Sequence, residues 1–491
     1  MGTVELYIFA GVVVLSAFLV WFRVRSRKSI RITKEFQAAL HRMHAGENLF
    51  ITGKAGTGKS TLLRHFVKES KRNLVVVTPT SIAALNVGGM TIHSFFEFGT
   101  GVLSPRAIME DCRKSEIFQS LETLIVDEIS MVRADLFECI NRSLQVNRGN
   151  NEPFGGVQVL LFGDPYQLPP IWVNRRSGLS EGVAVVDRRS GLSDAAVVEH
   201  RRSDLSDEAV VWKNRFFFET SAYKNASFSC IELMTVFRQN SRRFIDTLDR
   251  ARVGKVTQAD AALLNSRHGL NPRSGFGGAL IATTNRIANY TNKQYLAALP
   301  GSECRFFAQV SGKVFYHPAP FVLRLKVGAR IVMLRNDQQK QRWVNGTLGI
   351  VQNIDDTGIT VKLPSGVHCV SPEIWDQHEY ILNKSTGTIE QRPVGSFTQY
   401  PFALAWAMSI HKSQGQTFDR VVVDFGKGSF APGQGYVALS RCRSLAGLRL
   451  RRRFYPVDAH ADPRVCVFMN ETIPFAPDAE SDAHDLTDQA R

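Results

Sequence analysis

The sequence has little cysteine, and what it has is scattered. Seven cysteines occur in 491 residues, and no two of them form a Cys-x-x-Cys pair. Structural zinc sites usually show such pairs, so their absence argues against a zinc-binding protein. The same scatter argues against a disulfide framework and for reduced thiols in a cytosolic compartment.

Acidic residues are also too few to balance the basic ones. The chain has 60 lysines and arginines against 45 aspartates and glutamates, a formal net charge of +15. An excess of this size indicates a polyanionic partner, either nucleic acid or an anionic membrane surface, and charge alone does not choose between them. The hydrophobic content of 44% is that of a globular protein, and the length suffices for about two to four domains.

Long apolar runs are absent except at residues 6–22, LYIFAGVVVLSAFLVWF. As a helix this run would measure about 25 Å, a little less than the roughly 30 Å of a bilayer core. Basic residues follow it, which predicts the rest of the protein on the cytoplasmic side. Residues 1–28 are therefore predicted to be a membrane anchor with its basic flank. The alternative is a misassigned start that adds a spurious segment, while the uniformly apolar character argues against a mitochondrial presequence.

A glycine-rich loop follows the first predicted strand. Residues 48–52 form an apolar run, residues 53–60 are GKAGTGKS, and a helix is expected to follow. This order is typical of a nucleoside-triphosphate site, where backbone N–H groups and a helix N-terminus surround the phosphates. Lys59 is expected to reach the β- and γ-phosphates, and Ser60 to ligate Mg²⁺. The predicted nucleotide-binding residues of the loop are Gly53, Ala55, Gly56, Thr57, Gly58, Lys59, Ser60 and Thr61.

Two further apolar runs end in polar residues that would serve such a site. The first, LETLIVDEISM at residues 121–131, places Asp127 to hold the Mg²⁺ shell and Glu128 to orient the attacking water. The second ends in GDPYQLPP, which places Gln167 to sense the γ-phosphate. Strands that alternate with helices and end in polar loops predict an open parallel sheet with its ligand at the strand ends.

Residues 175–213 break this pattern with three near-identical 13-residue copies, each opening on an arginine pair. Thirteen residues at about 100° each leave a phase of about 220°, so the pairs would not line one face of a long helix. Short helices capped by Ser180, Ser193 and Ser206 are expected instead. The copies are interpreted either as an exposed, tolerated insertion or as a basic arm that contacts nucleic acid or a partner.

The second half of the chain shows a second α/β pattern with an insertion. An apolar stretch ends at Arg238, and a strand is expected at residues 279–282. From residue 330 to about 398 the chain is rich in predicted strands and turns, which indicates a small β-barrel inserted into this second unit.

The end of this unit carries a polar cluster and then a basic one. His411, Lys412 and Gln414 occur where an expected apolar helix in residues 401–417 meets a glycine loop, and a later helix is expected to end at Arg441. The tail from about residue 474 is polar and net acidic without apolar periodicity, so it is predicted to be disordered.

Taken in order, these segments resemble the motifs of a known family. The segments are GKAGTGKST, TPTSIAALNVGGMTIHSFF, DEISM, PFGGVQVLLFGDPYQLPP, VFRQ, AWAMSIHKSQGQT and YVALSRCRS. They are similar to the Pif-type (petite integration frequency) DNA helicases, RecD-like members of superfamily 1B, over about residues 32–452. The apolar N-terminus and the 13-residue copies depart from the family pattern.

The resemblance implies an α/β fold with two RecA-like lobes, ATP in the cleft between them, and single-stranded DNA across both. The implied domains are a first lobe at 29–230, a second lobe at 231–340 and 400–455, a Src-homology-3-like β-barrel at 341–399, and a C-terminal tail at 456–491. It implies that Gln37 reads adenine and that Arg238 and Arg441 act as arginine fingers in cis. Gln414 and Gly415 are implied to be nucleotide-binding residues.

The implied DNA contacts are Thr78, Pro79, Thr80 and His93 in the first lobe, and His411 and Lys412 in the second. Phe95 and Phe96 have the chemistry to stack on bases, although core packing is the preferred interpretation for Phe96. Binding to phosphates would show little sequence preference and strong salt dependence.

The resemblance implies a monomeric ATP- and Mg²⁺-dependent helicase that moves 5′ to 3′ on single-stranded, forked or G-quadruplex DNA. Replication, repair, recombination and telomere maintenance are the implied processes, in a bacterial cytoplasm or in a nucleus or mitochondrion. Two alternatives stay open. One is a membrane-tethered ATPase switch that acts on a protein partner, and the other is a DNA-binding ATPase that does not unwind.

Overall fold

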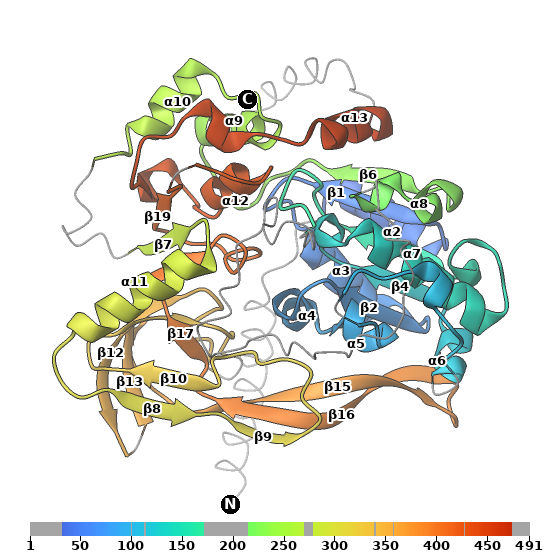
Figure 1. The fold of residues 1–491 in the computed structure, drawn as a ribbon, viewed down its shortest axis with the longest axis horizontal. Coiled ribbons are helices and arrows are strands. Elements are labelled where there is room, and N and C mark those ends of the chain that lie inside the picture. Colours follow the sequence, from blue (N-terminus) through green and yellow to red (C-terminus); the bar gives the residue numbers. More distant parts are fainter. Residues whose placement is uncertain are drawn as a thin grey trace, which may run out of the picture.

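The computed structural model describes residues 32–99, 101–111, 114–170, 215–269, 278–337, 340–356, 358–426 and 428–473. Figure 1 shows two α/β bodies beside each other, with a long antiparallel ribbon along the lower side of the view. Both bodies are built on parallel sheets, so the predicted α/β class is confirmed. The predicted anchor and the 13-residue copies lie outside the described residues. Within the ranges given above, no helix is long and apolar enough to cross a membrane.

The first parallel sheet has six strands in the order β3-β2-β4-β5-β1-β6. The strands are β1 (Leu49–Gly53), β2 (Leu74–Thr78), β3 (Met90–Thr91), β4 (Thr123–Val126), β5 (Gln158–Phe162) and β6 (Ser229–Leu233). Their near-continuous apolar character follows from burial of a parallel sheet on both faces. β6 pairs with β1 along its whole length, so the predicted lobe boundary at 230/231 falls inside a strand of the first sheet.

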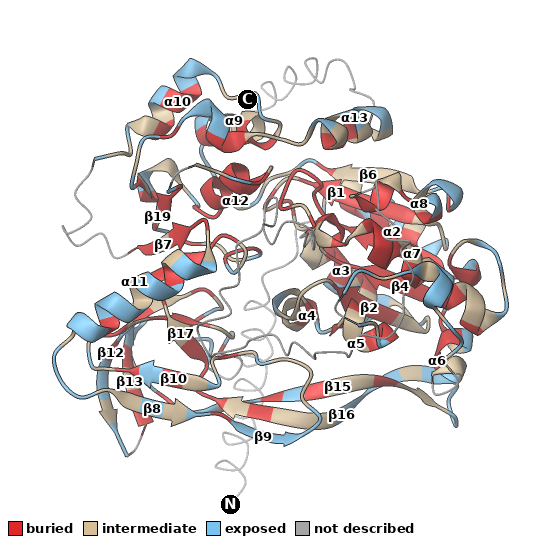
Figure 2. Ribbon diagram, in the orientation of Figure 1, coloured by how far each residue is buried: buried red, intermediate tan, exposed pale blue. Residues whose placement is uncertain are grey.

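Helices cover both faces of this sheet (Figure 1). They are α2 (Lys34–His44), α3 (Lys59–Glu69), α4 (Ser81–Val87), α5 (Ile92–Phe96), α6 (Ser115–Ser120), α7 (Ala134–Arg148) and α8 (Ser221–Asn225). Threonine hydroxyls start several of them, as Thr33 does for α2 and Thr80 for α4, because they accept a bond from an otherwise unpaired N–H. Figure 2 shows that the buried residues concentrate on the strands and on the helix faces turned toward them.

The second parallel sheet has four strands in the order β18-β7-β19-β20. The strands are β7 (Ala279–Ala282), β18 (Ala407–Ser409), β19 (Val421–Asp424) and β20 (Leu448–Leu450). The apolar helix expected before His411 is wrong, because residues 407–409 form β18, a buried strand that pairs with β7. The accompanying helices are α9 (Arg242–Arg252), α10 (Gln258–Asn265), α11 (Asn285–Ala298) and α12 (Gln434–Ser440). The two sheets have separate buried cores, as two independently packed lobes require.

Antiparallel strands are inserted into the second lobe between α11 and β18. They are β8 (Cys304–Phe307), β9 (Gln309–Gly312), β10 (Val322–Leu325), β11 (Arg330–Met333), β12 (Leu348–Asp355), β13 (Gly358–Leu363), β14 (Gly366–Val370), β15 (Glu373–Asn383), β16 (Thr388–Gln399) and β17 (Phe402–Leu404). They form a five-stranded, a three-stranded and a two-stranded sheet. Because β8 to β11 and β17 pair within these sheets, the inserted strands extend beyond the predicted range 341–399 at both ends.

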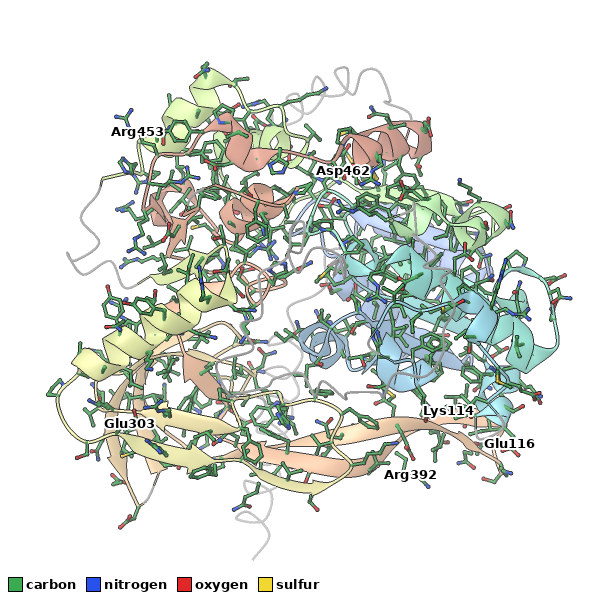
Figure 3. All side chains as sticks on the ribbon, in the orientation of Figure 1. Lys114, Glu116, Glu303, Arg392, Arg453 and Asp462 are labelled. Carbon is green, nitrogen blue, oxygen red and sulfur yellow. The ribbon has the colours of Figure 1, made fainter. Side chains whose placement is uncertain are left out.

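The β15–β16 hairpin reaches away from the other inserted strands and lies against the first lobe (Figure 1). The Tyr380 hydroxyl accepts a 3.1 Å hydrogen bond from the Val76 N–H of β2. At the tip, Lys384 Nζ lies 2.7 Å from an oxygen of Glu116, a residue of α6 labelled in Figure 3. The hairpin therefore ties the insertion to the first lobe as well as to the second.

A last helix, α13 (Pro463–Thr472), returns from the second lobe to the first. The Phe468 ring stacks on Phe218 with 4.1 Å between ring centroids, and the Arg464 guanidinium lies over the Phe216 ring. This helix lies in the range 456–491, which is predicted to be a tail. It is ordered against the first lobe because its apolar face completes the core of that lobe. The tail from residue 474 lies outside the described residues.

Candidate functional site

The glycine-rich loop connects β1 to α3, as its strand–loop–helix pattern predicts. Gly58 starts α3 in a left-handed conformation, with φ of 94°, and no side chain caps the helix. The start of a helix presents N–H groups that lack an intrahelical partner, so the first turn of α3 can receive an anion beside the loop. Lys59 Nζ donates to the carbonyl oxygens of Gly53, at 2.6 Å, and Lys54, at 3.1 Å, so the lysine lies along the inside of the loop.

Glycine is needed at position 56 for two reasons: the turn has a left-handed backbone there, and Arg238 lies too close for a side chain. Its φ is +88°, and an added Cβ would lie 2.5 Å from Arg238 Cβ. Phe237, beside that arginine, donates its N–H to the Gly56 carbonyl at 2.9 Å. The loop therefore contacts the segment that carries Arg238 directly. Thr57 is turned back on the loop through a bond from its hydroxyl to the Lys54 carbonyl.

Asp127 and Glu128 follow β4 and face the same cavity as Ser60. Burial, together with the neighbouring Glu128, raises the pKa of Asp127 to about 7. Burial also raises the pKa of Glu128, against the attraction of Lys59. Glu128 has a left-handed backbone, with φ of 53° and ψ of 43°, which is uncommon for a residue other than glycine and is concentrated at functional sites.

Two arginines approach from the second-lobe side. Arg441 is 1% exposed, and its Nε donates to the Val437 carbonyl at 2.9 Å. Arg238 Nη1 donates to the Ser440 carbonyl at 3.3 Å. Burial, with the neighbouring Arg238, lowers the pKa of Arg441 to about 9, and burial lowers the pKa of Arg238. The two guanidinium groups repel each other, and among the described residues no carboxylate is hydrogen-bonded to either, an arrangement that a bound polyanion would stabilise.

Gln167 lies in the loop after β5, where Asp164 holds it. Gln167 Nε2 donates to Asp164 Oδ2 at 3.2 Å, and both side chains are buried. Gln37 lies on α2, and its side chain is exposed. Thr61 is part of the first turn of α3, and its N–H donates to the Gly58 carbonyl.

Sequence reasoning missed three contacts that join the lobes at this site. The Ala55 N–H donates to the Tyr436 hydroxyl at 2.8 Å, and Lys54 Nζ lies 2.6 Å from Asp249 Oδ2. The third contact is a buried ion pair between Arg252 Nη2 and Asp164 Oδ1 at 2.9 Å. Each partner is more than 80 residues from the other in sequence.

Some signal for these contacts was present in the sequence. Tyr436 and Asp164 lie inside the quoted motifs YVALSRCRS and GDPYQLPP, although neither was given a role. Nothing distinguishes Arg252 or Asp249 from the other charged residues of α9, because that helix carries charges along most of its length.

A cavity of about 1030 Å³ runs from this site between the lobes and the inserted strands. Of the predicted DNA contacts, Thr80, His411 and Lys412 line it, as do Gln414 and Gly415. The inserted strands add side chains that sequence reasoning did not select, among them Arg335 and Trp375.

Thr78, Pro79 and His93 are not among the lining residues. Thr78 is fully buried, and its hydroxyl donates to the Thr80 carbonyl, a bond within the loop itself. His93 lies on α5, where burial lowers its pKa.

Phe95 and Phe96 are both core residues. They are 1% and 6% exposed, and each contacts Phe118. Core packing of Phe96 is confirmed, whereas the stacking role considered for Phe95 is wrong, because its ring lies among Phe118, Lys114 and Tyr380.

The side chains at the loop have the chemistry to hold Mg²⁺ together with phosphates. In the part of the chain that the structure describes, no three histidine, cysteine, aspartate or glutamate side chains group as metal ligands. Mg²⁺ needs only one or two carboxylates when phosphates and waters complete its shell. Ser60 and Asp127, which face one cavity, match that requirement.

Comparisons with known proteins agree with these observations. Residues 31–185 match the model of the PIF1-like helicase family, and residues 316–354 match the model of the DNA helicase Pif1 2B domain. The chain is 32% identical over 450 residues to the ATP-dependent DNA helicase PIF1 of Danio rerio, covering 89% of this chain and 63% of that protein. The chain thus spans less than two thirds of this relative's length.

A bacterial relative is covered almost completely. The ATP-dependent DNA helicase Pif1 of Bdellovibrio bacteriovorus is 30% identical over 459 residues, which are 90% of this chain and 92% of that protein. Among solved structures, Bacteroides sp Pif1 in complex with ADP-AlF4 superposes with a TM-score of 0.77 at 32% identity, covering 90% and 97% of the two chains. Bacteroides Pif1 bound to ssDNA gives 0.62 at 33% identity with the same coverage. With its parallel sheets, its phosphate loop and these relatives, the chain belongs to the PIF1-like helicase family.

Proposed function

We propose that this protein is an ATP-dependent DNA helicase that moves 5′ to 3′ on single-stranded DNA. One observation carries the proposal. Buried lysine and arginine side chains and buried carboxylates gather where the lobes meet, and burial disfavours the charged form of each. Burial lowers the pKa of Lys59, Arg238 and Arg441, and it raises the pKa of Asp127 and Glu128. A triphosphate supplies the anion that the first group needs, and Mg²⁺ supplies the cation that the second group needs.

Each residue has a defined task in this proposal. The loop N–H groups and Lys59 would hold the β- and γ-phosphates, and Ser60 and Asp127 would hold Mg²⁺, which would supply positive charge beside the phosphates. Glu128 orients the attacking water and takes up its proton. Gln167, on the buried Asp164, senses the γ-phosphate, and Gln37 is assigned to the adenine edge.

The two arginines make hydrolysis depend on the second lobe. Arg238 and Arg441 would act as arginine fingers in cis and stabilise the negative charge that develops on the transferred phosphoryl group. Arg238 already lies against the phosphate loop at Gly56. Small movements between the lobes therefore reach the phosphate directly, which is what a motor needs to convert hydrolysis into movement.

The cavity between the lobes and the inserted strands is the proposed path of the DNA strand. Thr80, His411 and Lys412 line it, and stacking on an aromatic residue such as Trp375 would tolerate any base sequence. The relative solved with ssDNA superposes less well than the one solved with ADP-AlF4, which supports an arrangement here that changes when DNA binds. Single-stranded, forked and G-quadruplex DNA are the proposed substrates, in replication, repair or recombination.

The remaining parts of the proposal concern the insertion and the N-terminus. The five-stranded sheet β14-β13-β12-β11-β17 is assigned to the Src-homology-3-like barrel. Residues 6–22 are assigned to a membrane anchor. Fractionation of cells that express the full chain tests this assignment, and a protein found entirely in the soluble fraction would remove it.

Strand separation by the full chain tests the central proposal. Duplexes with either a 5′ or a 3′ single-stranded tail are incubated with ATP and Mg²⁺, with Lys59→Ala as the control. Unwinding of only the 5′-tailed duplex, lost in the control, supports both activity and polarity. Unwinding of only the 3′-tailed duplex refutes the polarity. ATP turnover stimulated by DNA without unwinding of either duplex would reduce the protein to a DNA-binding ATPase.

A further inference from the structure

Residues 409–417 link the proposed DNA path to the proposed nucleotide site. Gln414 Nε2 donates to Glu128 Oε2 at 3.1 Å, a contact between the two lobes. The Gln414 side chain is only 9% exposed, so water competes little for this bond. His411 and Lys412, three and two residues earlier, line the cavity assigned to the DNA strand.

This segment is a series of tight turns, so its parts move together. The Gln414 N–H donates to the His411 carbonyl at 3.2 Å, and the Ser413 N–H donates to the Ser409 carbonyl at 3.0 Å. The Ser413 hydroxyl adds a bond to the Ile410 carbonyl at 2.8 Å. A displacement of His411 and Lys412 by a bound strand is therefore transmitted to Gln414.

The same segment also contacts a proposed arginine finger. Arg441 Nη1 donates to the Gln416 carbonyl at 3.4 Å. One short stretch of chain thus contacts the DNA cavity, the residue assigned to the attacking water and an arginine assigned to the transition state.

We propose that Gln414 is a positioning residue that restrains Glu128 when no DNA is bound. The amide donor occupies one carboxylate oxygen of Glu128, the oxygen that would otherwise accept a bond from the attacking water. Glu128 stands on a left-handed backbone, and Asp127 Oδ1 holds its N–H at 3.0 Å, so its side chain has few alternative directions. DNA bound at His411 and Lys412 moves the segment and releases the carboxylate. The inference rests on the proposed function, since its readout is ATP turnover.

The test compares ATP turnover with and without single-stranded DNA in the full chain. Gln414→Met keeps the length and burial of the side chain but removes the donor, and Gln414→Ala is a second variant in case methionine packs poorly. The matched control is Gln258→Met, the same substitution at an exposed glutamine of α10 that is not among the cavity-lining residues. We expect the donor-free variants to raise turnover without DNA by about tenfold and to reduce the stimulation ratio by a similar factor. The control should keep the wild-type ratio.

The outcomes separate this inference from the proposed function. Wild-type protein that hydrolyses no ATP with or without DNA refutes both. DNA-stimulated turnover in the wild type, with an unchanged ratio in Gln414→Met and Gln414→Ala, refutes the restraint alone. Lower turnover without DNA in both variants also refutes it, because Gln414 would then assist Glu128 instead of restraining it.

Discussion

The buried pair of Arg252 and Asp164 makes the strongest single prediction about stability. Arg252 belongs to α9 of the second lobe, and Asp164 to the loop after β5 of the first. Their side chains are 7% and 0% exposed. Three guanidinium-to-carboxylate contacts join them at 2.9 to 3.2 Å, and the guanidinium also lies 4.7 Å from the centre of the Tyr166 ring. The change considered is Arg252→Met, which keeps much of the volume and removes the charge.

The expected cost follows from what Asp164 would retain. After the substitution the carboxylate keeps the Gln167 amide at 3.2 Å and the Tyr166 N–H at 3.3 Å, and it is still attracted by the charges of Lys59 and Arg441, but it loses its ion pair with Arg252. Breaking a buried ion pair by removing one partner costs about 3–5 kcal/mol. The whole protein is expected to be stable by about 5–15 kcal/mol, so the variant should fold with most of its margin lost.

Denaturation of the full chain in urea measures this cost, with Arg242→Met as the matched control. Arg242 is on the same helix, but it is 89% exposed and forms a surface ion pair with Asp246, so its loss should cost less than about 0.5 kcal/mol. A double-mutant cycle with Asp164→Asn isolates the pair. A cost below about 1 kcal/mol for Arg252→Met, or additive effects in the cycle, would refute the argument.

Three further predictions concern single residues. Gly56→Ala should reduce ATP turnover by at least about tenfold, because the new Cβ would lie 2.5 Å from Arg238 Cβ at φ +88°; wild-type kinetics in a steady-state assay would contradict this. Tyr380→Phe should cost about 1–3 kcal/mol and speed hydrogen exchange at Val76, whose N–H loses its partner; unchanged exchange would count against the hairpin contact. Burial lowers the pKa of His411, so the neutral ring should stabilise the fold above about pH 6.5, with that stability lost as pH falls below it. Unfolding measured between pH 5 and 8 should show a smaller acid loss for His411→Gln, and equal losses would exclude this residue as the cause.

The nucleotide side of the site was predictable because parallel strands end at one edge. β4 neighbours β5, and β5 neighbours β1. The loops that carry Asp127, Gln167 and Lys59 therefore meet at one edge of the sheet, although they are far apart in sequence. Local sequence alone sets the loop geometry, since glycine is needed at the left-handed positions. The family motifs then located Arg238 and Arg441 at the same place.

The contacts between lobes could not be derived in the same way. The Ala55 bond to Tyr436 and the Arg252 pair with Asp164 depend on how two separately folded units meet, which no local pattern records. β6 is a short run next in sequence to the second lobe, and only its pairing with β1 assigns it to the first. Phe95 illustrates a related difficulty, because an aromatic residue in a DNA motif has the same sequence signal whether its ring faces DNA or the core.

The return of α13 to the first lobe has a mechanical consequence. Within the described residues the chain passes between the lobes twice, once between β6 and α9 and once before α13. The second crossing ends in α13, which side-chain packing holds to the first lobe, so it is a non-covalent attachment. A single proteolytic cut between β6 and α9 would therefore leave the two lobes associated through non-covalent contacts, among them the packing of α13 and of the β15–β16 hairpin on the first lobe. A cut before α13 would instead leave the lobes covalently joined and release α13 to depend on its packing alone.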